Sequence, residues 1–556
     1  MTLDFTGTDA LNLSAQTLRV ARHLGYLYGE EREIVITATA CAIAALAAGS
    51  VCFELSGPDG FEWRQALESS PLVSAQLDRP LVLDGMSVYL TRYWMEQARI
   101  VDWIFSRTIT NPNPSASDDP SLQAALDRYF PDPSDQRDAA KQASQHSFCV
   151  IAGGPGTGKT TTVAGLLAVM ASTTSTPLRV ILAAPTGRAA ARLEQAVREN
   201  LAGFGDLDPD LRYSSGTLHR VLGLKPWGPP TMHAAHPVPA DVVVVDEASM
   251  LSLHLMSLLL DAIAPTTRLI LVGDPDQLAS VEAGAVLADI VASDVTVPVT
   301  RLTHTYRFGG AIADLAETIR VGDAESALAI LAGNPDEIEW IPTPAASASP
   351  EALQGLRETA TNQGRALIEA ASAGEMERAL TLLDSHRLLV GHRHGLVGVS
   401  YWTRQVRGWI APGTEWTGHW YPGMPVLITG NDDLLGIYNG DSGVIVEKAG
   451  ELLLAVGDGV TTRLITPDLI QSWEPLYAST IHKSQGSQFN TVSLILPPAT
   501  TALLTRELFY TAVTRAKTFL CVIGDPDSVR HAITSPALRA SGLALKLAAL
   551  HSNLEI

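Results

Sequence analysis

The chain has 556 residues, a length that corresponds to about three or four domains. Hydrophobic residues make up 46% of it and charged residues 18%, and this composition excludes an intrinsically disordered protein. The formal net charge of −20 does not favour nucleic-acid binding by the surface as a whole. Any such binding therefore has to use a local basic groove.

Four cysteines lie in apolar stretches, and none of them form a C-x-x-C pair. They predict buried thiols in a reducing compartment, not a metal or iron–sulfur site. Residues 34–53 form the one membrane-like run, but its threonines and strand-like end favour a buried helix followed by a strand. Residues 1–5 lack the basic region of a signal peptide, so we expect a cytoplasmic protein that makes no contact with a membrane.

Residues 1–110 predict a mainly helical N-terminal domain without a catalytic constellation. A strand and turn are expected at 80–85, and the Pro-, Asn- and Ser-rich segment 110–120 is a linker by composition. Segments with helical spacing of apolar residues are 18–28, 34–46 and 89–103.

From residue 121 onward, apolar β runs alternate with helical segments, a pattern typical of a parallel sheet with helices on both faces. We predict two α/β domains, one at 121–305 and one formed by 306–422 and 471–556. The strands expected in the first are 148–152, 179–183, 241–245, 268–272 and 297–302. Those expected in the second are 387–391, 491–496 and 519–524.

Residues 423–470 interrupt the second α/β domain with a different pattern. Short strand-like runs are broken there by Gly, Asn and Asp, which predicts a small inserted antiparallel β-barrel. The runs are 425–429, 442–448, 452–456 and 461–465.

The segment 153–160 reads G-x-x-x-x-G-K-T between an apolar run and a helical pattern, as a phosphate-binding loop requires. Its backbone N–H groups would close around phosphate, and the helix N-terminus would add its positive end. Lys159 would reach the β- and γ-phosphates of ATP, and Thr160 would hold Mg²⁺. An ordinary Gly-rich turn does not explain this context. The loop residues expected to bind nucleotide are Gly153, Gly154, Pro155, Gly156, Thr157, Gly158, Lys159, Thr160 and Thr161.

Two acids, Asp246 and Glu247, end the apolar run 242–245. A buried strand places its last side chains at the carboxyl edge of a parallel sheet, where ligands bind. Asp246 would coordinate Mg²⁺ through water, and Glu247 would orient or deprotonate the attacking water. The alternative is a pair of helix-capping acids.

Three more residues fit phosphoryl-transfer chemistry. Gln277 follows the next predicted strand, and its amide can donate to phosphate or accept from water. Arg307 and Arg515 can neutralise charge on the transferred phosphoryl group, although each taken alone also fits a surface or ion-paired arginine. Because Arg515 lies in the second α/β domain, its reach to a nucleotide on the first would make domain closure depend on ATP.

The order of these motifs over about 121–556 resembles superfamily I DNA helicases, which implies two tandem RecA-like motor domains. Residues 135–140 are similar to the family's adenine-reading glutamine motif, and 480–487 to the motif that joins DNA to ATP. Residues 184–190 and 216–220 are similar to its single-strand contacts. The resemblance implies further nucleotide contacts from Gln136, Tyr306, Gly486 and Gln488. It implies DNA contacts from Pro185, Thr186, Arg188, Thr217, His219, Thr480, His482 and Lys483, of which Thr217 and His219 also fit capping or core roles.

Further segments narrow the resemblance to the RecD family, the α subunits of exodeoxyribonuclease V (RecBCD), along nearly the whole chain. They are 49–55, 83–85, 92–94, 431–441 and 482–487. The resemblance implies a 5′→3′ DNA helicase that acts at double-strand breaks, on single- and double-stranded DNA ends. It also implies a heterotrimer with RecB-like and RecC-like subunits, in which the N-terminal domain docks on the RecC-like subunit.

One departure concerns Gln488, which stands where the family usually has a glutamate thought to contact the ribose. A glutamine still accepts a hydrogen bond from a hydroxyl, so we expect activity to survive. Residues 224–240, with their Pro-Trp-Gly-Pro-Pro run, fall where related helicases carry a strand-separating pin, and a stiff surface loop fits the composition equally well.

Two alternatives stay open besides a RecBCD-type subunit. One is a free-standing RecD-like helicase, whose usual relatives carry a longer N-terminal extension. The other is a regulatory subunit with a vestigial ATPase, against which the complete set of motor residues argues. A generic P-loop kinase or GTPase explains neither Arg515 nor residues 482–487. No nuclease-type cluster of acids and lysine stands out beyond the motor motifs, so nuclease activity is expected on a partner.

Overall fold

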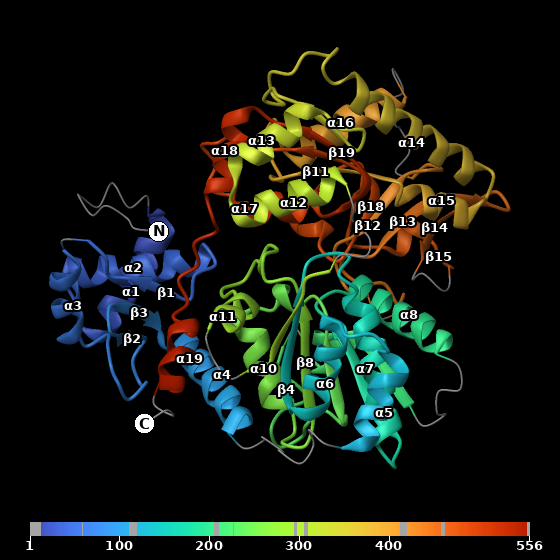
Figure 1. Cartoon of the computed structure of the whole chain (residues 1–556). Coiled ribbons are helices and arrows are strands. Elements are labelled where there is room, and N and C mark those ends of the chain that lie inside the picture. Colours follow the sequence, from blue (N-terminus) through green and yellow to red (C-terminus); the bar gives the residue numbers. More distant parts are fainter. Residues whose placement is uncertain are drawn as a thin grey trace.

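In the computed structural model, three bodies are arranged as an N-terminal domain beside a first α/β domain, with a second α/β domain above it (Figure 1). The structure describes residues 13–57, 59–109, 119–204, 211–225, 227–293, 297–304, 310–411, 420–432, 434–457 and 462–552.

The first α/β domain is built on a six-stranded parallel sheet of order β6-β5-β7-β8-β4-β9. Its central strands are almost continuous apolar runs because helices cover both faces. All five predicted strands are confirmed, and β6 is an addition. The strands are β4 (Phe148–Gly153), β5 (Leu178–Ala184), β6 (Leu211–Thr217), β7 (Val242–Val245), β8 (Arg268–Gly273) and β9 (Val299–Leu302).

One face of this sheet shares a core with four helices, α5 (Pro120–Tyr129), α6 (Asp135–Gln145), α7 (Lys159–Thr173) and α8 (Gly187–Gly203). The other face packs against α10 (Leu253–Ala262) and α11 (Val286–Ala292). A short helix, α9 (Leu218–Val221), follows β6, and a 3₁₀ turn, η3 (Ala248–Met250), follows β7.

The second α/β domain has a five-stranded parallel sheet of order β10-β19-β18-β11-β17, which confirms the prediction of two parallel-sheet domains. Its strands are β10 (Ile338–Ile341), β11 (His386–Val390), β17 (Ser479–Thr480), β18 (Phe489–Ile495) and β19 (Ala516–Ile523). One core contains α12 (Ala311–Val321), α13 (Ala324–Gly333), α17 (Arg506–Val513) and α18 (Pro526–Thr534). The other contains α14 (Gln354–Ser372) and α16 (Val399–Ile410).

An antiparallel sheet of order β15-β14-β13-β12-β16 is inserted in this domain and packs against α14 and α15 (Met376–Leu383). The pairings described for it leave β15 and β16 at its two edges, so closure into a barrel stays a prediction. Its strands are β12 (Pro425–Ile428), β13 (Ser442–Lys448), β14 (Glu451–Gly457), β15 (Thr462–Ile465) and β16 (Trp473–Pro475).

In its described residues, 13–57 and 59–109, the N-terminal domain combines four helices with a three-stranded antiparallel sheet of order β1-β3-β2. The run 34–53 forms the largely buried α2 and then β1, as predicted. Within the described ranges, no helix is both long and apolar enough to cross a membrane. The elements are α1 (Ala15–Tyr28), α2 (Glu33–Ala47), β1 (Cys52–Glu54), α3 (Gly60–Glu68), β2 (Leu81–Asp84), β3 (Ser87–Leu90) and α4 (Thr91–Ile109).

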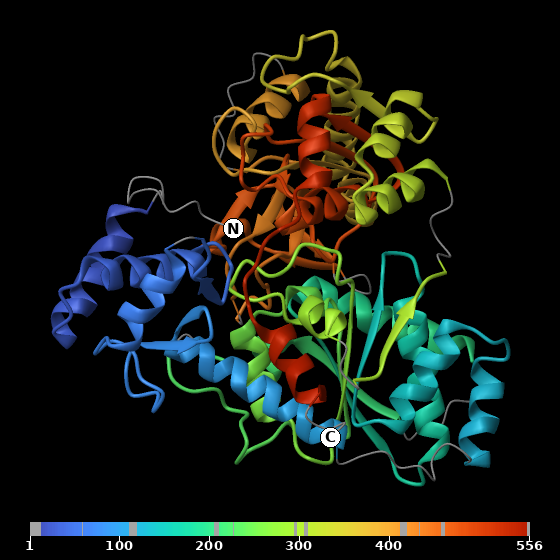
Figure 2. The ribbon, with the colours of Figure 1, turned by 60° about the vertical axis from the view of Figure 1, so that its left-hand side comes forward.

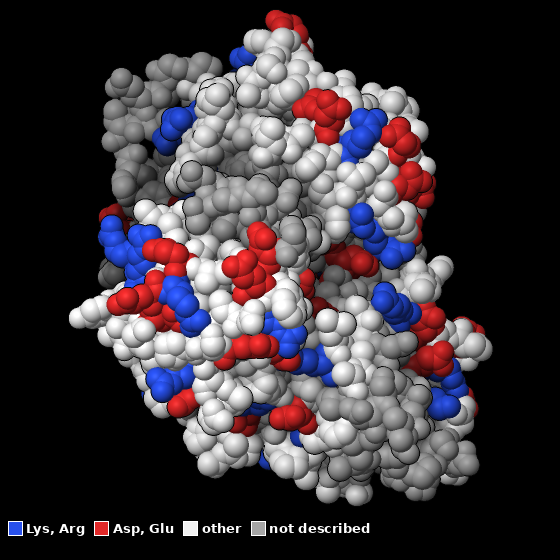
Figure 3. All heavy atoms as spheres, turned by 90° about the vertical axis from the view of Figure 1, so that its left-hand side faces the viewer, with Lys and Arg blue, Asp and Glu red and all other residues white. Residues whose placement is uncertain are grey.

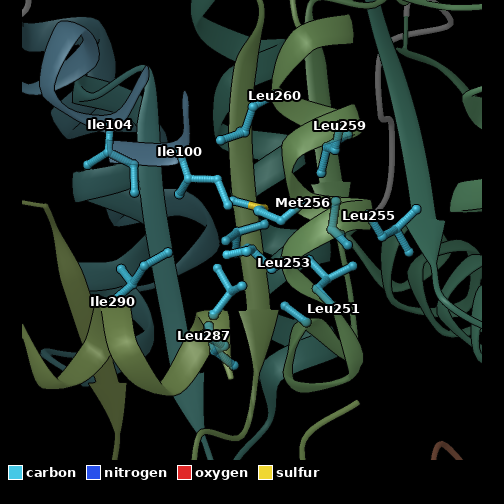
Figure 4. Close-up of a cluster of buried hydrophobic side chains, with 14 of the residues drawn as sticks. Ile100, Ile104, Leu251, Leu253, Leu255, Met256, Leu259, Leu260, Leu287 and Ile290 are labelled. Carbon is cyan, nitrogen blue, oxygen red and sulfur yellow. The ribbon is translucent and has the colours of Figure 1, made fainter. Parts of the chain in front are cut away.

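The N-terminal domain and the first α/β domain share one hydrophobic core. Ile100 and Ile104 of α4 point toward Met256 of α10 and Ile290 of α11 (Figure 4). The guanidinium of Arg107 adds hydrogen bonds to three carbonyl groups just after α10, those of residues 264, 265 and 267. Because this core is continuous, the two domains form one packed unit.

Residues 540–547 pack against the interface between the N-terminal domain and the first α/β domain. Helix α19 (Leu543–Ser552) lies beside α4 and α11 (Figure 2), and Leu543 and Leu547 belong to the same core. The preceding segment is tied to the N-terminal domain, because the carbonyl of Ala540 accepts hydrogen bonds from the backbone N–H groups of Val51 and Cys52. Residues 540–547, which belong to the range 471–556 assigned above to the second α/β domain, therefore pack on the other two domains.

Replacing Ile100 by alanine should weaken this joint. The side chain is fully buried, so its loss leaves a cavity that costs roughly 2–5 kcal/mol of stability. We expect a lower midpoint of thermal unfolding for the intact chain. Val20→Ala, on an exposed position of α1, is the matched control and should change stability by less than about 0.5 kcal/mol. Equal midpoints for the two variants would contradict the shared core.

Candidate functional site

The loop between β4 and α7 has the backbone of an anion-binding turn. Gly156 and Gly158 adopt positive φ angles of 80° and 82°, a region that L side chains rarely enter. The ammonium of Lys159 lies inside the loop and donates to the carbonyls of Gly153 at 2.7 Å and Gly154 at 2.9 Å. The lysine that would contact phosphate is thus held at the mouth of the loop.

A cavity of about 430 Å³ opens in front of this loop, between the two α/β domains. It is lined by residues from both of them, and most of the predicted nucleotide-site residues meet there. They are Gln136, Pro155, Gly156, Gly158, Lys159, Thr160, Thr161, Asp246, Glu247, Gln277, Gly486, Gln488 and Arg515. Two others, Tyr306 and Arg307, lie outside the described residues.

The acid pair after β7 faces the cavity. Asp246 accepts a hydrogen bond from the N–H of Glu247 at 2.8 Å, and Glu247 has a positive φ of 52°, an uncommon conformation for a residue with a side chain. The Glu247 side chain makes no capping hydrogen bond to η3, so the structure does not support a capping role for it.

Desolvation, followed by the negative charge of Glu247, raises the pKa of Asp246 above its ordinary value, and Lys159 opposes this shift. Two neighbouring carboxylates ionise together more readily when a cation compensates them. The carboxylates and the Thr160 hydroxyl supply the oxygen ligands that Mg²⁺ prefers, so these residues fit the predicted metal.

Gln277 and Arg515 are both buried at the cavity wall. The Nε2 of Gln277 donates to Oδ2 of Asp274 at 2.9 Å, while its Oε1 is buried and has no hydrogen-bond partner among the described residues. The Arg515 guanidinium donates to the carbonyls of Thr511 and Ser487 in its own domain. Burial lowers its pKa, and the nearby Glu247 and Asp274 oppose that shift.

Two glutamines that are predicted to contact the nucleotide, Gln136 and Gln488, line the cavity. The amide of Gln136 approaches the carbonyl of Thr157 at 3.5 Å, and its helix is anchored because Asp135 accepts two hydrogen bonds from Thr303. The Oε1 of Gln488 is buried and has no hydrogen-bond partner within the part of the chain that the structure describes. That unpaired acceptor is suited to a hydroxyl group of a bound molecule.

A wider groove of about 930 Å³ continues from the cavity between α8 and the inserted sheet. Arg188 lines it and bridges the domains through an ion pair with Asp384 at 2.6 Å and a hydrogen bond to Ser442. One helical turn later, Arg192 donates to the carbonyl of Gly486 at 2.7 Å. Sequence reasoning missed Arg192, although its i, i+4 spacing from Arg188 places both on one helix face.

Several residues that are predicted to contact DNA also make hydrogen bonds or ion pairs within the protein. Thr186 and Thr217 accept capping hydrogen bonds at the starts of α8 and α9, so the capping alternative holds for Thr217. Lys483 forms an ion pair with Glu474 at 2.9 Å. His482 is half-buried and burial lowers its pKa. The groove is lined by Arg188 and Thr217 but is not lined by Pro185, Thr186, His219, Thr480, His482 or Lys483.

With this geometry in place, comparison with known proteins is informative. Residues 133–343 match the family model of an AAA domain, and residues 475–523 match that of a UvrD-like helicase C-terminal domain. The chain is 43% identical to the RecBCD enzyme subunit RecD of Mycolicibacterium smegmatis, over 96% of this chain and 97% of that protein. This chain belongs to the RecD family. The RecD subunit of Haemophilus influenzae is 31% identical, over 84% of this chain and 80% of that protein.

RecD family membership confirms the resemblance drawn from the sequence, and it makes the chain a DNA helicase and ATPase. A further relative is the ATP-dependent RecD2 DNA helicase of Deinococcus radiodurans, which is 31% identical. The match covers 69% of this chain and only 48% of that protein.

If Gln488 contacts the ribose, its replacement by alanine should raise the KM for ATP by about 2- to 10-fold, the effect of one lost hydrogen bond. The KM for 2′,3′-dideoxy-ATP should stay unchanged, because that nucleotide lacks the ribose hydroxyls. Gln488→Glu keeps an acceptor and is the matched control. Steady-state ATPase assays measure both constants, and an equal rise with both nucleotides would exclude the ribose contact.

Proposed function

We propose that the chain is the ATP-driven 5′→3′ motor subunit of a RecBCD-type helicase–nuclease that processes double-strand DNA ends for recombinational repair. The observation that carries this proposal is the cavity between the α/β domains. Lys159, Asp246 and Gln277 of the first domain face Arg515 of the second across it. A site divided between two domains is the arrangement that converts hydrolysis into relative motion.

In this proposal the loop residues bind the phosphates of ATP and Lys159 contacts the β- and γ-phosphates. Thr160 and Asp246 hold Mg²⁺, which neutralises phosphate charge when bound. Glu247 orients the attacking water and takes its proton, and Arg515 stabilises negative charge on the transferred phosphoryl group. Binding closes the cleft, and release of products opens it.

Single-stranded DNA would lie across both motor domains and be gripped in alternation. Two of the cations predicted to meet its phosphates are already engaged, since Arg188 of the groove pairs with Asp384, and Lys483, outside the groove lining, pairs with Glu474. These pairs are partly exposed, so exchanging a carboxylate for a phosphate costs little. The face that carries the N-terminal domain shows both charge signs interspersed, with no broad basic surface (Figure 3).

RecB-like and RecC-like partners are favoured over a free-standing helicase. The chain spans 97% of a protein named as a RecBCD subunit but 48% of the RecD2 helicase. We assign partner docking to the N-terminal domain, nuclease activity to a partner and the complex to the cytoplasm. In the segment 224–240, the 90% exposed Trp227 is suited to contact a DNA fork, as a strand-separating pin would.

Lys159→Ala and Arg515→Ala should each abolish DNA-stimulated ATPase, because each removes a positive charge that meets the phosphates. Co-purification of the variants with the partner subunits should be unchanged. Full ATPase activity in either variant would reject the assigned site. ATPase that is absent from the unaltered complex as well would favour the regulatory subunit with a vestigial ATPase.

Unwinding of duplexes with a 5′ tail, but not a 3′ tail, is the expected polarity for the isolated chain. The assay compares both substrates with and without partner subunits, and Lys159→Ala is the control for ATP dependence. Unwinding only from 3′ tails would overturn the polarity. Recovery of the chain from its native cells without two large subunits in stoichiometric amounts would support the free-standing alternative.

A further inference from the structure

A buried hydrogen-bond relay lies directly behind Gln277 and joins the two motor domains. Asp274, the first residue after β8, is 1% exposed. Its Oδ2 accepts from Nε2 of Gln277 at 2.9 Å and from the hydroxyl of Tyr510 at 3.1 Å. Tyr510 belongs to α17 of the second motor domain and is itself 4% exposed. One carboxylate oxygen thus serves a residue from each domain.

The protonation of the Asp274 carboxyl and the Tyr510 phenol decides which atom of the Gln277 amide faces Asp274. Burial and the nearby Asp274 raise the pKa of Tyr510 well above its ordinary value, so the phenol keeps its proton and donates. Burial raises the pKa of Asp274, while Lys159 and the hydrogen bond from Gln277 oppose that shift. In the structure the N–H₂ group of Gln277 donates to the Asp274 carboxyl group, which accepts. The amide oxygen of Gln277 is then on the side away from Asp274, and this buried Oε1 has no hydrogen-bond partner in the described ranges of the chain.

We propose that Asp274 and Tyr510 are positioning residues that hold Gln277 with its amide oxygen toward the ATP cavity, as an acceptor for the attacking water. This inference rests on the proposed ATP site. It decides between the two roles open to the glutamine, because a donor to phosphate would need the opposite amide orientation. It also makes the orientation depend on the docking of the second motor domain, which supplies Tyr510.

Neighbouring contacts tie the same turn to the second domain. The N–H of Leu278 donates to the hydroxyl of Thr511 at 2.8 Å, and the amide of Gln485 donates to the carbonyl of Leu278 at 2.5 Å. Gln485 lies in the segment 480–487, which is similar to the motif that joins DNA to ATP. A shift of that segment on DNA binding therefore reaches the turn that carries Asp274 and Gln277.

Tyr510→Phe is the primary test, because it removes one hydroxyl and keeps the buried ring. We expect the kcat of DNA-stimulated ATPase to fall by about tenfold, the effect of one hydrogen bond acting on the transition state, with the KM for ATP within twofold. Asp274→Ala removes the acceptor that Gln277 and Tyr510 share, so its kcat should fall further at the same KM.

Thr511→Val is the matched control, since it removes the neighbouring interdomain hydrogen bond and leaves Asp274 and Tyr510 in place. Its kcat should stay within threefold. If Thr511→Val and Tyr510→Phe lower kcat equally, or if both raise KM, the relay only holds the domains together and the positioning role is wrong. An unchanged kcat in Tyr510→Phe would also show that the positioning role is wrong.

Failure of the inference is distinguishable from failure of the proposed function. If the unaltered chain has DNA-stimulated ATPase that Lys159→Ala abolishes, the ATP site stands whatever Tyr510→Phe does. If the unaltered chain lacks ATPase altogether, the proposed function and the inference both fail. Thermal unfolding midpoints equal to that of the unaltered chain exclude misfolding as the cause of a loss in kcat.

Discussion

The nucleotide cavity depends on one constraint: the carboxyl edge of the first parallel sheet meets the amino edge of the second. Asp246 follows β7 and Asp274 follows β8, whereas Gln488 precedes β18 and Arg515 precedes β19. Each side chain therefore reaches the boundary between the domains because of where its strand starts or stops. A parallel sheet gathers strand ends of one kind at one edge, so each domain contributes several groups at once.

This placement also sets the electrostatics of the site. Lys159 and Arg515 approach from different domains, and Asp246 and Glu247 lie between them in a desolvated cavity. Positive and negative groups are nearly matched in number, so neither domain alone is left with a large uncompensated charge. In the proposed function, a polyphosphate with its metal ion would join an existing alternation of charge, and it would link the domains because its negative oxygens would meet cations from both.

The sequence predicts the parts of this fold that local pattern controls. Buried parallel strands read as apolar runs, and the glycine spacing of the phosphate loop reflects the φ angles observed at Gly156 and Gly158. Strand β6 was missed because its residues are half-buried or exposed and include Ser214, Ser215 and Gly216. Strands β10 and β17 are short, and their pairing is decided by distant segments.

The sequence does not predict side-chain contacts between segments that are far apart in the chain. Motif spacing brought Gln277 and Arg515 to attention, but nothing local indicates that Tyr510 donates to Asp274, 236 residues earlier. The resemblance to helicase motifs also does not show that Thr186 caps α8 or that Arg188 and Lys483 form ion pairs within the protein. These contacts depend on the three-dimensional arrangement of the chain.

The returning helix has a consequence for how the protein is made. Leu543 and Leu547 complete the core that contains Ile100, and more than 400 residues separate them in the chain. On the ribosome, both motor domains emerge before that core can close, and contacts of such long sequence separation form slowly. The N-terminal domain has a separate core of its own and can fold early. Its complete attachment to the first motor domain waits for residues 540–547, which are synthesised after the strands of both motor sheets.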